Sequence, residues 1–235
     1  MAEKKCNRCN THKCLQSFSP DIRRKLGLLP SVTSIIKCAA SPGLELWKNQ
    51  QILMAALTTD RIENESEQEW VDRIIKDSQE QALRARERGT LIHSYVQDWF
   101  EGNEIEQGLD GYPFAMSAHD TIFNEVKNQE WVCEKSFSTE KYGGKADLHN
   151  INFLIDIKTT DKPVEDLKLW DDHYLQLAAY RAGLGIITAT CGILYINSRT
   201  AASRLVWAGE KELVKGMKMF NALLDYYYSK TGLGE

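Results

Sequence analysis

The stretch "GKADLHNINFLIDIKTTDK", from Gly144 to Lys162, has an Asp-Ile-Lys triplet directly after the apolar run "FLI". Alternate side chains of a strand share a face, so Asp156 and Lys158 are expected to point the same way. The stretch reads as two antiparallel strands that turn through 150–153. This pairing places Asp147 opposite Asp156, with Cβ atoms about 5 Å apart. Two carboxylates and one lysine are therefore expected to meet on one hairpin.

Two carboxylates at that distance repel each other unless a cation binds between them. Hard divalent cations such as Mg²⁺ or Mn²⁺ take oxygen ligands from both groups and remove the repulsion. Lys158 could then orient or help deprotonate an attacking water and offset the charge of a phosphate. The pattern indicates phosphodiester hydrolysis. The alternative is an exposed edge hairpin on which Asp156 and Lys158 form a solvated ion pair.

The segments around this hairpin show alternating helix and strand patterns. One helix is expected after Ser31 or Thr33, another opens near Pro42, and a long one, or two in line, follows the capping box of Ser66 and Glu69 and ends near 102. The sequence further predicts a helix over 165–185, a final helix that includes 213–227, and strands over 131–137, 143–149, 152–160, 188–197 and 203–209.

Composition limits the classes of protein that remain. The chain has 235 residues, of which 43% are hydrophobic and 26% charged, enough for one large domain or two small ones with a core. The net charge of -4 gives no overall attraction to nucleic acid, so binding would need local basic patches. No apolar run approaches the roughly 20 residues of a membrane span, and no secretory signal is present. A cytoplasmic location is expected.

Five short motifs follow one another along the chain. They are "RGTLIH" with His93, "VCEKSF" with Glu134, "GGKAD" with Asp147, "DIK" with Asp156 and Lys158, and "QLAAY" with Gln176 and Tyr180. From about Leu29 to Tyr180, this order resembles the PD-(D/E)XK nuclease superfamily, in particular its RecB-like exonuclease branch. The resemblance implies an α/β fold with a restriction-endonuclease-like core, in which helices flank a short mixed sheet and the N-terminal part is helical.

The resemblance also implies roles for individual residues. The expected ligands of Mg²⁺ or Mn²⁺ are His93, Asp147, Asp156 and the carbonyl of Ile157. Lys158 is expected to serve the nucleophilic water, and Glu134 is a support or second-metal candidate. Gln176 and Tyr180 would contact the DNA backbone or support the site, and Lys145 and Thr159 are further residues expected to bind DNA or to support the site. Each of these side chains could instead be an ordinary packed or exposed residue.

A second likeness concerns the substrate. The segments "LPSVTSII" and "LELWK" are similar to the N-terminal part of phage-encoded and mitochondrial genome maintenance exonucleases of this branch. Single-stranded DNA with a free end is therefore the expected partner, in phage replication, recombination or repair, with the host cytoplasm as location if the chain is phage-encoded. Two alternatives stay open: a double-strand end-processing exonuclease or endonuclease, and an inactive nucleic-acid-binding subunit.

The first 29 residues are expected to form a polar arm, with one nuclease domain over 30–235, mainly helical over 30–128 and built on the sheet over 129–235. The arm contains "CNRCNTHKC", and Cys6, Cys9, His12 and Cys14 are candidate zinc ligands because a Cys-x2-Cys pair opens many zinc sites. Cys38 is an alternative to His12. The other interpretation is an arm with reduced thiols.

Local positive charge and aromatic residues are the remaining features that suggest nucleic acid. The basic positions are 23–25, 84–88, Lys135, Lys141 and Lys145, which could follow phosphates or simply be solvated. The aromatic candidates for stacking on unpaired bases are Trp99, Phe100, Trp131 and Trp170. Most aromatic residues at helical spacing belong to a core, so none of the four is singled out.

Overall fold

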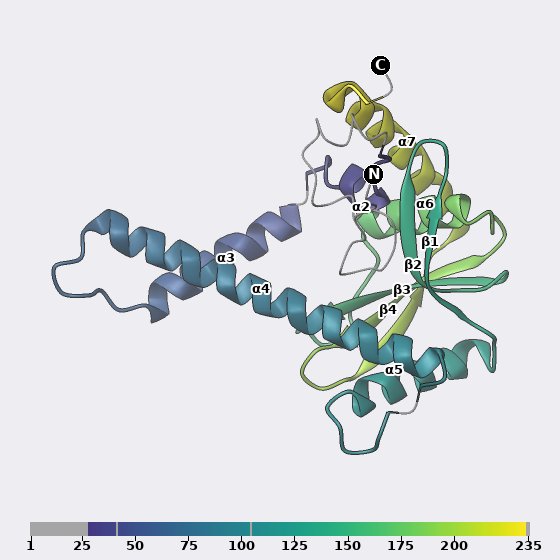
Figure 1. The fold of residues 1–235 in the computed structure, drawn as a ribbon, viewed down its shortest axis with the longest axis horizontal. Coiled ribbons are helices and arrows are strands. Elements are labelled where there is room, and N and C mark those ends of the chain that lie inside the picture. The colour runs from purple at the N-terminus through teal and green to yellow at the C-terminus, as the bar shows by residue number, and fades with distance from the viewer. Residues whose placement is uncertain (1–27, 41, 104, 234–235) are drawn as a thin grey trace, which may run out of the picture.

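A five-stranded mixed sheet forms the centre of the molecule, with the strands in the order β1-β2-β3-β4-β5 (Figure 1). The computed structural model describes residues 28–40, 42–103 and 105–233. The strands are β1 (Val132–Ser138), β2 (Gly143–His149), β3 (Phe153–Thr160), β4 (Thr190–Asn197) and β5 (Ser203–Trp207). The helices are α2 (Val32–Ile36), α3 (Pro42–Thr58), α4 (Glu67–Phe100), α5 (Tyr112–Val126), α6 (Asp171–Gly183) and α7 (Glu210–Thr231).

The pairing of the strands follows from their connections. β1, β2 and β3 form an antiparallel meander, β3 and β4 are parallel and joined through α6, and β5 returns antiparallel to β4. A parallel pair needs such a crossover, whereas antiparallel neighbours need only a turn. The expected strands and their order along the chain are confirmed.

Helices cover both faces of the sheet, and β3 is buried on both sides. Leu154 of β3 packs in a cluster with α2, α6 and α7, whereas Ile155 and Ile157 pack in a second cluster with α4 and α5. A strand enclosed in this way reads as a continuous apolar run, which explains "FLI". The fold is the α/β, restriction-endonuclease-like core with a helical N-terminal part that the sequence analysis expected.

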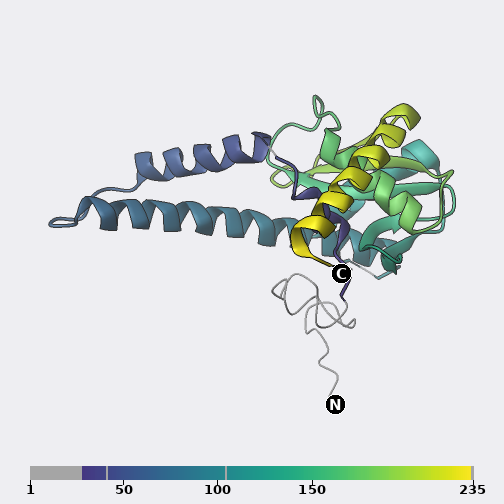
Figure 2. The same cartoon turned by 90° about the horizontal axis from the view of Figure 1, so that it is seen from above.

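The helix α4 is one unbroken helix of 34 residues, about 50 Å long. Ser66 and Glu69 form the predicted capping box at its start. With α3 it makes a helical hairpin that extends well beyond the sheet, as Figures 1 and 2 show from two directions. The predicted apolar stripe is therefore buried only in part: Ile92 and Val96 are fully covered, but Val71 is 40% exposed because its part of α4 packs on α3 alone.

Two helices differ from the expectation. The helix expected over 165–185 begins only at Asp171. The residues before it form a non-helical segment in which the backbone carbonyls of Val164, Glu165 and Leu167 accept hydrogen bonds from Arg204. The helix α5 was not assigned from the sequence; it opens at Tyr112 with a proline in its first turn.

The β2–β3 turn and the N-terminal segment complete the comparison with the sequence. Asn150 Oδ1 accepts the backbone N–H groups of Asn152 and Phe153, both at 2.8 Å, which holds the predicted turn. Ser31, and not Thr33, caps α2. The candidate zinc ligands Cys6, Cys9, His12 and Cys14 and the basic run 23–25 lie outside the described residues. In the part of the chain that is described, no helix is long and apolar enough to span a bilayer.

Candidate active site

The β1–β2 hairpin bends at the two carboxylates that it contributes to the site. The register on both sides of the bend places Glu134 opposite Asp147. Glu134 has a φ of 49°, a backbone conformation that costs energy for any residue other than glycine. Ala146 packs on the α6 and α7 face, yet Leu148, two residues further, packs on the α4 and α5 face. The side-chain faces of β2 therefore change around Asp147.

The strand β2 also separates from β3 at this point. It pairs with β3 at His149 and Leu148, and the same register places Asp147 opposite Asp156, as predicted. Instead of continuing the ladder, the Asp147 carboxylate accepts the backbone N–H of Ile157 through Oδ2 at 2.7 Å. This bond holds Asp147 at the edge of β3, beside the Asp156 to Lys158 segment.

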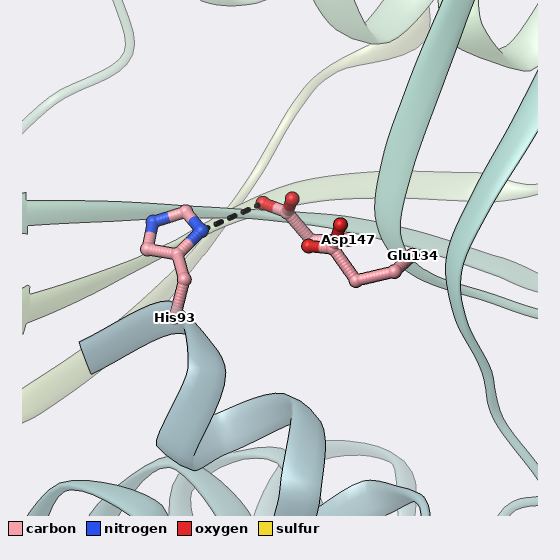
Figure 3. A group of neighbouring side chains, drawn as sticks. All are labelled: His93, Glu134 and Asp147. Atoms are coloured by element: carbon pink, nitrogen blue, oxygen red, sulfur yellow. Dashed lines mark ion pairs between the residues drawn. The ribbon is translucent and has the colours of Figure 1, made fainter. Parts of the chain in front are cut away.

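A third side chain reaches the bend from α4. His93 Nδ1 lies 3.7 Å from Asp147 Oδ2, and one ligand atom each from His93, Glu134 and Asp147 falls within 4.8 Å of the others (Figure 3). Two carboxylate oxygens and an imidazole nitrogen fit a divalent cation. Glu134 also forms an ion pair with Lys145, so one lysine partly offsets its charge in the described state.

A glycine allows α4 to come this close. A Cβ on Gly89 would lie 2.8 Å from Thr159 Oγ1 of β3, which is closer than side-chain atoms normally approach. Gly89 precedes His93 by one helical turn, so both lie on the face of α4 that meets the sheet. Thr159, expected to bind DNA or to support the site, forms part of this helix–strand contact.

Asp156 and Lys158 lie next to the cluster and are joined by Gln176 of α6. Lys158 Nζ is 2.6 Å from Asp156 Oδ2 and donates to Gln176 Oε1 at 3.0 Å. Gln176 Nε2 donates to Asp156 Oδ1 at 2.8 Å and to the hydroxyl oxygen of Tyr180 at 3.1 Å. These neighbours determine the amide orientation, because only its oxygen can face an ammonium. The predicted common face of Asp156 and Lys158 is confirmed.

The carboxylates of this site outnumber its lysines. Asp156 Oδ2 is buried and lies 2.6 Å from Lys158 Nζ, its ion-pair partner, and Glu134 pairs with Lys145. Among the described residues, the three carboxylates of Glu134, Asp147 and Asp156 thus face only these two lysines and His93, an excess of negative charge that fits an additional positive ligand. Asp156 thereby supports the cation site, although it is not one of the three residues that lie within 4.8 Å.

The charges of the site separate the pKa values of its two aspartates. Burial alone would raise the pKa of Asp147, but His93, the Ile157 N–H and Lys158 outweigh it, and the pKa is lowered. Burial raises the pKa of Asp156, and the Asp147 charge adds to this against the attraction of Lys158. The pKa of Lys158 is raised, because Asp156 and Asp147 together outweigh the opposite effect of burial. A metal cation near Asp156, in addition to the Lys158 ammonium, would lower the pKa of Asp156 and favour its ionised form.

His173 is a residue near the site that the sequence analysis missed. It lies one turn before Gln176 on α6, and its Nδ1 is 3.2 Å from the hydroxyl oxygen of Tyr195. Its pKa is lowered, mainly by burial, with Asp172 raising it and the Lys158 charge lowering it further. The spacing of three residues before Gln176 could have indicated this shared face.

Of the other predicted contacts, Lys145 reaches the site through its ion pair with Glu134. Lys135 and Lys145 are both exposed, on β1 and β2. Lys141, between these strands, contributes its carbonyl to Tyr228. Trp170 precedes α6 and is 67% exposed. The described ranges thus bring His93, Glu134, Asp147, Asp156, Lys158, Gln176 and Tyr180 to one place.

Comparison with known proteins finds similarity only among solved structures. No protein-family profile matches the sequence, and no curated protein matches it. A protein of Eubacterium rectale that is assigned as an exonuclease has a similar structure, with 16% identity, a TM-score of 0.41, and coverage of 63% of this chain and 69% of that one. An alkaline exonuclease from Laribacter hongkongensis has 11% identity and a TM-score of 0.36, covering 87% and 93%. At such identities the chemistry must be inferred from the side chains.

Proposed function

We propose that the protein is a metal-dependent deoxyribonuclease of the PD-(D/E)XK type that hydrolyses phosphodiester bonds. The observation that carries the proposal is the convergence of His93, Glu134 and Asp147 within 4.8 Å, next to the Asp156–Lys158–Gln176 network. The motif order in the sequence predicts the same residues. A solvated ion pair on an edge hairpin does not account for Asp156, which is only 3% exposed.

The side chains that would hold the cation are His93, Glu134, Asp147 and Asp156, with the Ile157 carbonyl as the fifth donor that the family resemblance implies. A bound Mg²⁺ or Mn²⁺ would supply Lewis-acid polarisation of the phosphoryl oxygen and a lower pKa for a bound water. The excess of carboxylate oxygens over nitrogen donors favours such hard cations over softer ones.

The chain's own residues then have separate roles. Lys158 is held as an ammonium and donates hydrogen bonds, so it orients the attacking water or offsets phosphate charge rather than acting as the base in the described state. Gln176 positions both Lys158 and Asp156 through one amide. Tyr180 is buried, with a raised pKa caused mainly by burial, so it stays a neutral hydroxyl that supports Gln176.

The finer assignment is an exonuclease of the RecB-like branch that acts on single-stranded DNA ends in phage replication, recombination or repair. The exposed Lys135 and Lys145 lie on strands next to the cluster and could contact phosphates, and 84–88 of α4 adds further exposed arginines. Double-strand end processing and an inactive binding subunit are the competing assignments. A zinc site at Cys6, Cys9, His12 and Cys14 and a cytoplasmic location stay predictions from the sequence.

The test is digestion of end-labelled linear and circular DNA, single- and double-stranded, with Mg²⁺, Mn²⁺ or EDTA. Asp156→Ala and Lys158→Ala should abolish metal-dependent degradation. The chain contains its own control, because Asp166-Leu167-Lys168 is a second Asp-x-Lys triplet, exposed and outside the sheet. Asp166→Ala and Lys168→Ala should retain full activity. Degradation of linear single strands alone supports the finer assignment, and no cleavage by folded wild-type protein refutes the nuclease proposal.

A further inference from the structure

An open cavity of about 470 Å³ lies between the C-terminal end of α4, the helix α5 and the start of β1. Its walls include five aromatic rings, and we name it the aromatic cleft. The five residues are Trp99, Phe100, His119, Phe123 and Trp131. None of them belongs to the candidate metal site formed by His93, Glu134 and Asp147, which we call the metal cluster, or to the network around Gln176.

The cleft is closed on one side by the core and open to solvent on the other. Phe100 and Trp131 pack against the buried cluster that includes Ile122. Phe123 is 41% exposed and stacks on His119, with ring centroids 5.8 Å apart and an angle of 22°. Trp99 is tilted against the same imidazole at 5.6 Å. The exposed Phe123 ring offers apolar, flat surface to a planar ligand.

Polar groups of the cleft are also available. Among the described residues, the indole N–H groups of Trp99 and Trp131 have no acceptor, and the Asn128 amide has no partner. Neither indole N–H is among the buried unpaired polar atoms of the described residues, so both can donate to solvent or to a ligand. A ligand with a flat ring and acceptors at its edge, such as a nucleobase, matches the rings and these donors.

The charge of the cleft points to bases rather than phosphates. Lys127 is its cation and Glu130 its anion, so the lining has no net charge apart from His119. Lys127 Nζ lies 6.0 Å from the centroid of the Phe123 ring. Binding here would depend on stacking, which is sequence-tolerant, and only weakly on salt.

The aromatic cleft lies at about the same distance from the metal cluster along α4 and along β1. Phe100 follows His93 by seven residues on α4, or about 10 Å at 1.5 Å per residue. Trp131 precedes Glu134 by three residues at β1, or about 10 Å at 3.3 Å per residue. Three stacked nucleotides span about the same length at ~3.4 Å each. A DNA strand that is bound at the metal cluster through its phosphate can therefore place one of its bases in the aromatic cleft.

We propose that the aromatic cleft binds one unpaired nucleobase of the DNA strand, about three nucleotides from the phosphodiester at the metal cluster. The proposal rests on the proposed function and adds to it a base-binding subsite. A base within a duplex is already stacked on both faces and paired at its edge, so this subsite favours single-stranded substrate.

The first experiment measures binding of a fluorescent oligothymidylate of 12 nucleotides in EDTA, which removes divalent cations and so prevents metal-dependent cleavage. Phe123→Ala should weaken binding about tenfold, because stacking on one aromatic side chain contributes on that order. The loss should be similar at low and high salt. Phe123→Trp should retain binding, and the matched control is Tyr226→Ala on α7, which removes a ring that is 51% exposed elsewhere. Unchanged affinity of a folded Phe123→Ala overturns the proposal.

The second experiment locates the base. A single abasic site is moved along the oligonucleotide, and each version is tested with wild-type protein and Phe123→Ala. At one position, about three nucleotides from the cleaved bond in the metal-containing digestion, the effect of Phe123→Ala should disappear because no base is left to stack. An effect of equal size at every position overturns the subsite. If wild-type protein neither binds nor cuts DNA, the proposed function fails as well, whereas active protein without this position-dependence refutes only the subsite.

Discussion

Gly89 of α4 packs directly against Thr159 of β3, with space for a hydrogen atom but not for a methyl group. A Cβ on Gly89 would lie 2.8 Å from Thr159 Oγ1 and 4.0 Å from Thr159 Cβ. This contact determines how far α4 approaches the sheet. His93 lies one turn further along the same face, so the distance between His93 and Asp147 depends on it.

We expect Gly89→Ala to lower stability by about 1 kcal/mol, because overpacking costs ~1–3 kcal/mol and the better helix propensity of alanine offsets part of it. Activity should fall by more than the loss of stability explains, because the substitution pushes α4 outward and moves His93 away from Asp147. Thr159→Ala in the same protein should restore the stability, since it removes Oγ1 and leaves only an ordinary contact. Urea denaturation of the single and double variants measures this. Gly43→Ala, with nothing within 4 Å, should stabilise α3, and a double variant no better than Gly89→Ala would contradict the explanation.

Removal of a metal ligand should abolish the stabilisation that a divalent cation provides. At a Mn²⁺ concentration 100 times its dissociation constant, the wild-type protein should gain about 2.7 kcal/mol, a rise in Tm of several degrees. Asp147→Asn and Glu134→Gln should each lose most of this rise, because each removes a carboxylate ligand. Asp225→Asn, an exposed carboxylate of α7, should respond like the wild type. An undiminished rise in Asp147→Asn would place the cation elsewhere.

Gln176→Leu should lower kcat about tenfold or more with little change in KM. The substitution keeps the approximate volume but leaves Asp156 Oδ1 without its donor, at ~1–3 kcal/mol for an unpaired buried group, and removes one of the two partners of Lys158. Steady-state kinetics on a short oligonucleotide measure both constants. Gln68→Leu removes a glutamine that bonds Asp72 on the exposed start of α4 and should leave kcat unchanged. Equal effects of the two variants would argue against a positioning role for Gln176.

His149 should make the protein less stable below neutral pH. Its Nδ1 is buried without a hydrogen-bond partner. Burial is the main cause that lowers its pKa below the ordinary 6.5; the backbone of Val132 opposes this shift, and the Lys135 charge adds to it. The unfolded chain therefore binds a proton first as the pH falls through 6.5. The contribution of His149 to the free energy of unfolding is therefore complete above pH 6.5 and declines as the pH falls from 6.5 to the lowered pKa. Urea denaturation between pH 7.5 and 5 should show a shallower decline in His149→Gln; equal slopes would contradict the assignment.

The predictions from sequence succeeded where neighbours along the chain decide the structure. The alternation of β3 placed Asp156 and Lys158 on one face, the Asn150 side chain formed the turn that sets the register, and Ser66 with Glu69 capped α4. Each of these depends on contacts within a few residues. The same local rules missed the late start of α6, where the segment before the helix is bound by Arg204, a residue distant in sequence.

The sequence by itself therefore determined which ionisable groups lie on which strand face and in what order along the chain, because backbone periodicity is a local property. The order of motifs, through the family resemblance, also pointed to His93, Glu134 and Asp147. Only the tertiary structure decided how closely these three side chains approach, since this requires the bend at Glu134, the separation of β2 from β3, and the close approach of α4 at Gly89. It likewise decided that the aromatic rings of α4, α5 and the start of β1 line one open cleft. Long-range packing sets such distances, and no local periodicity in the chain specifies them.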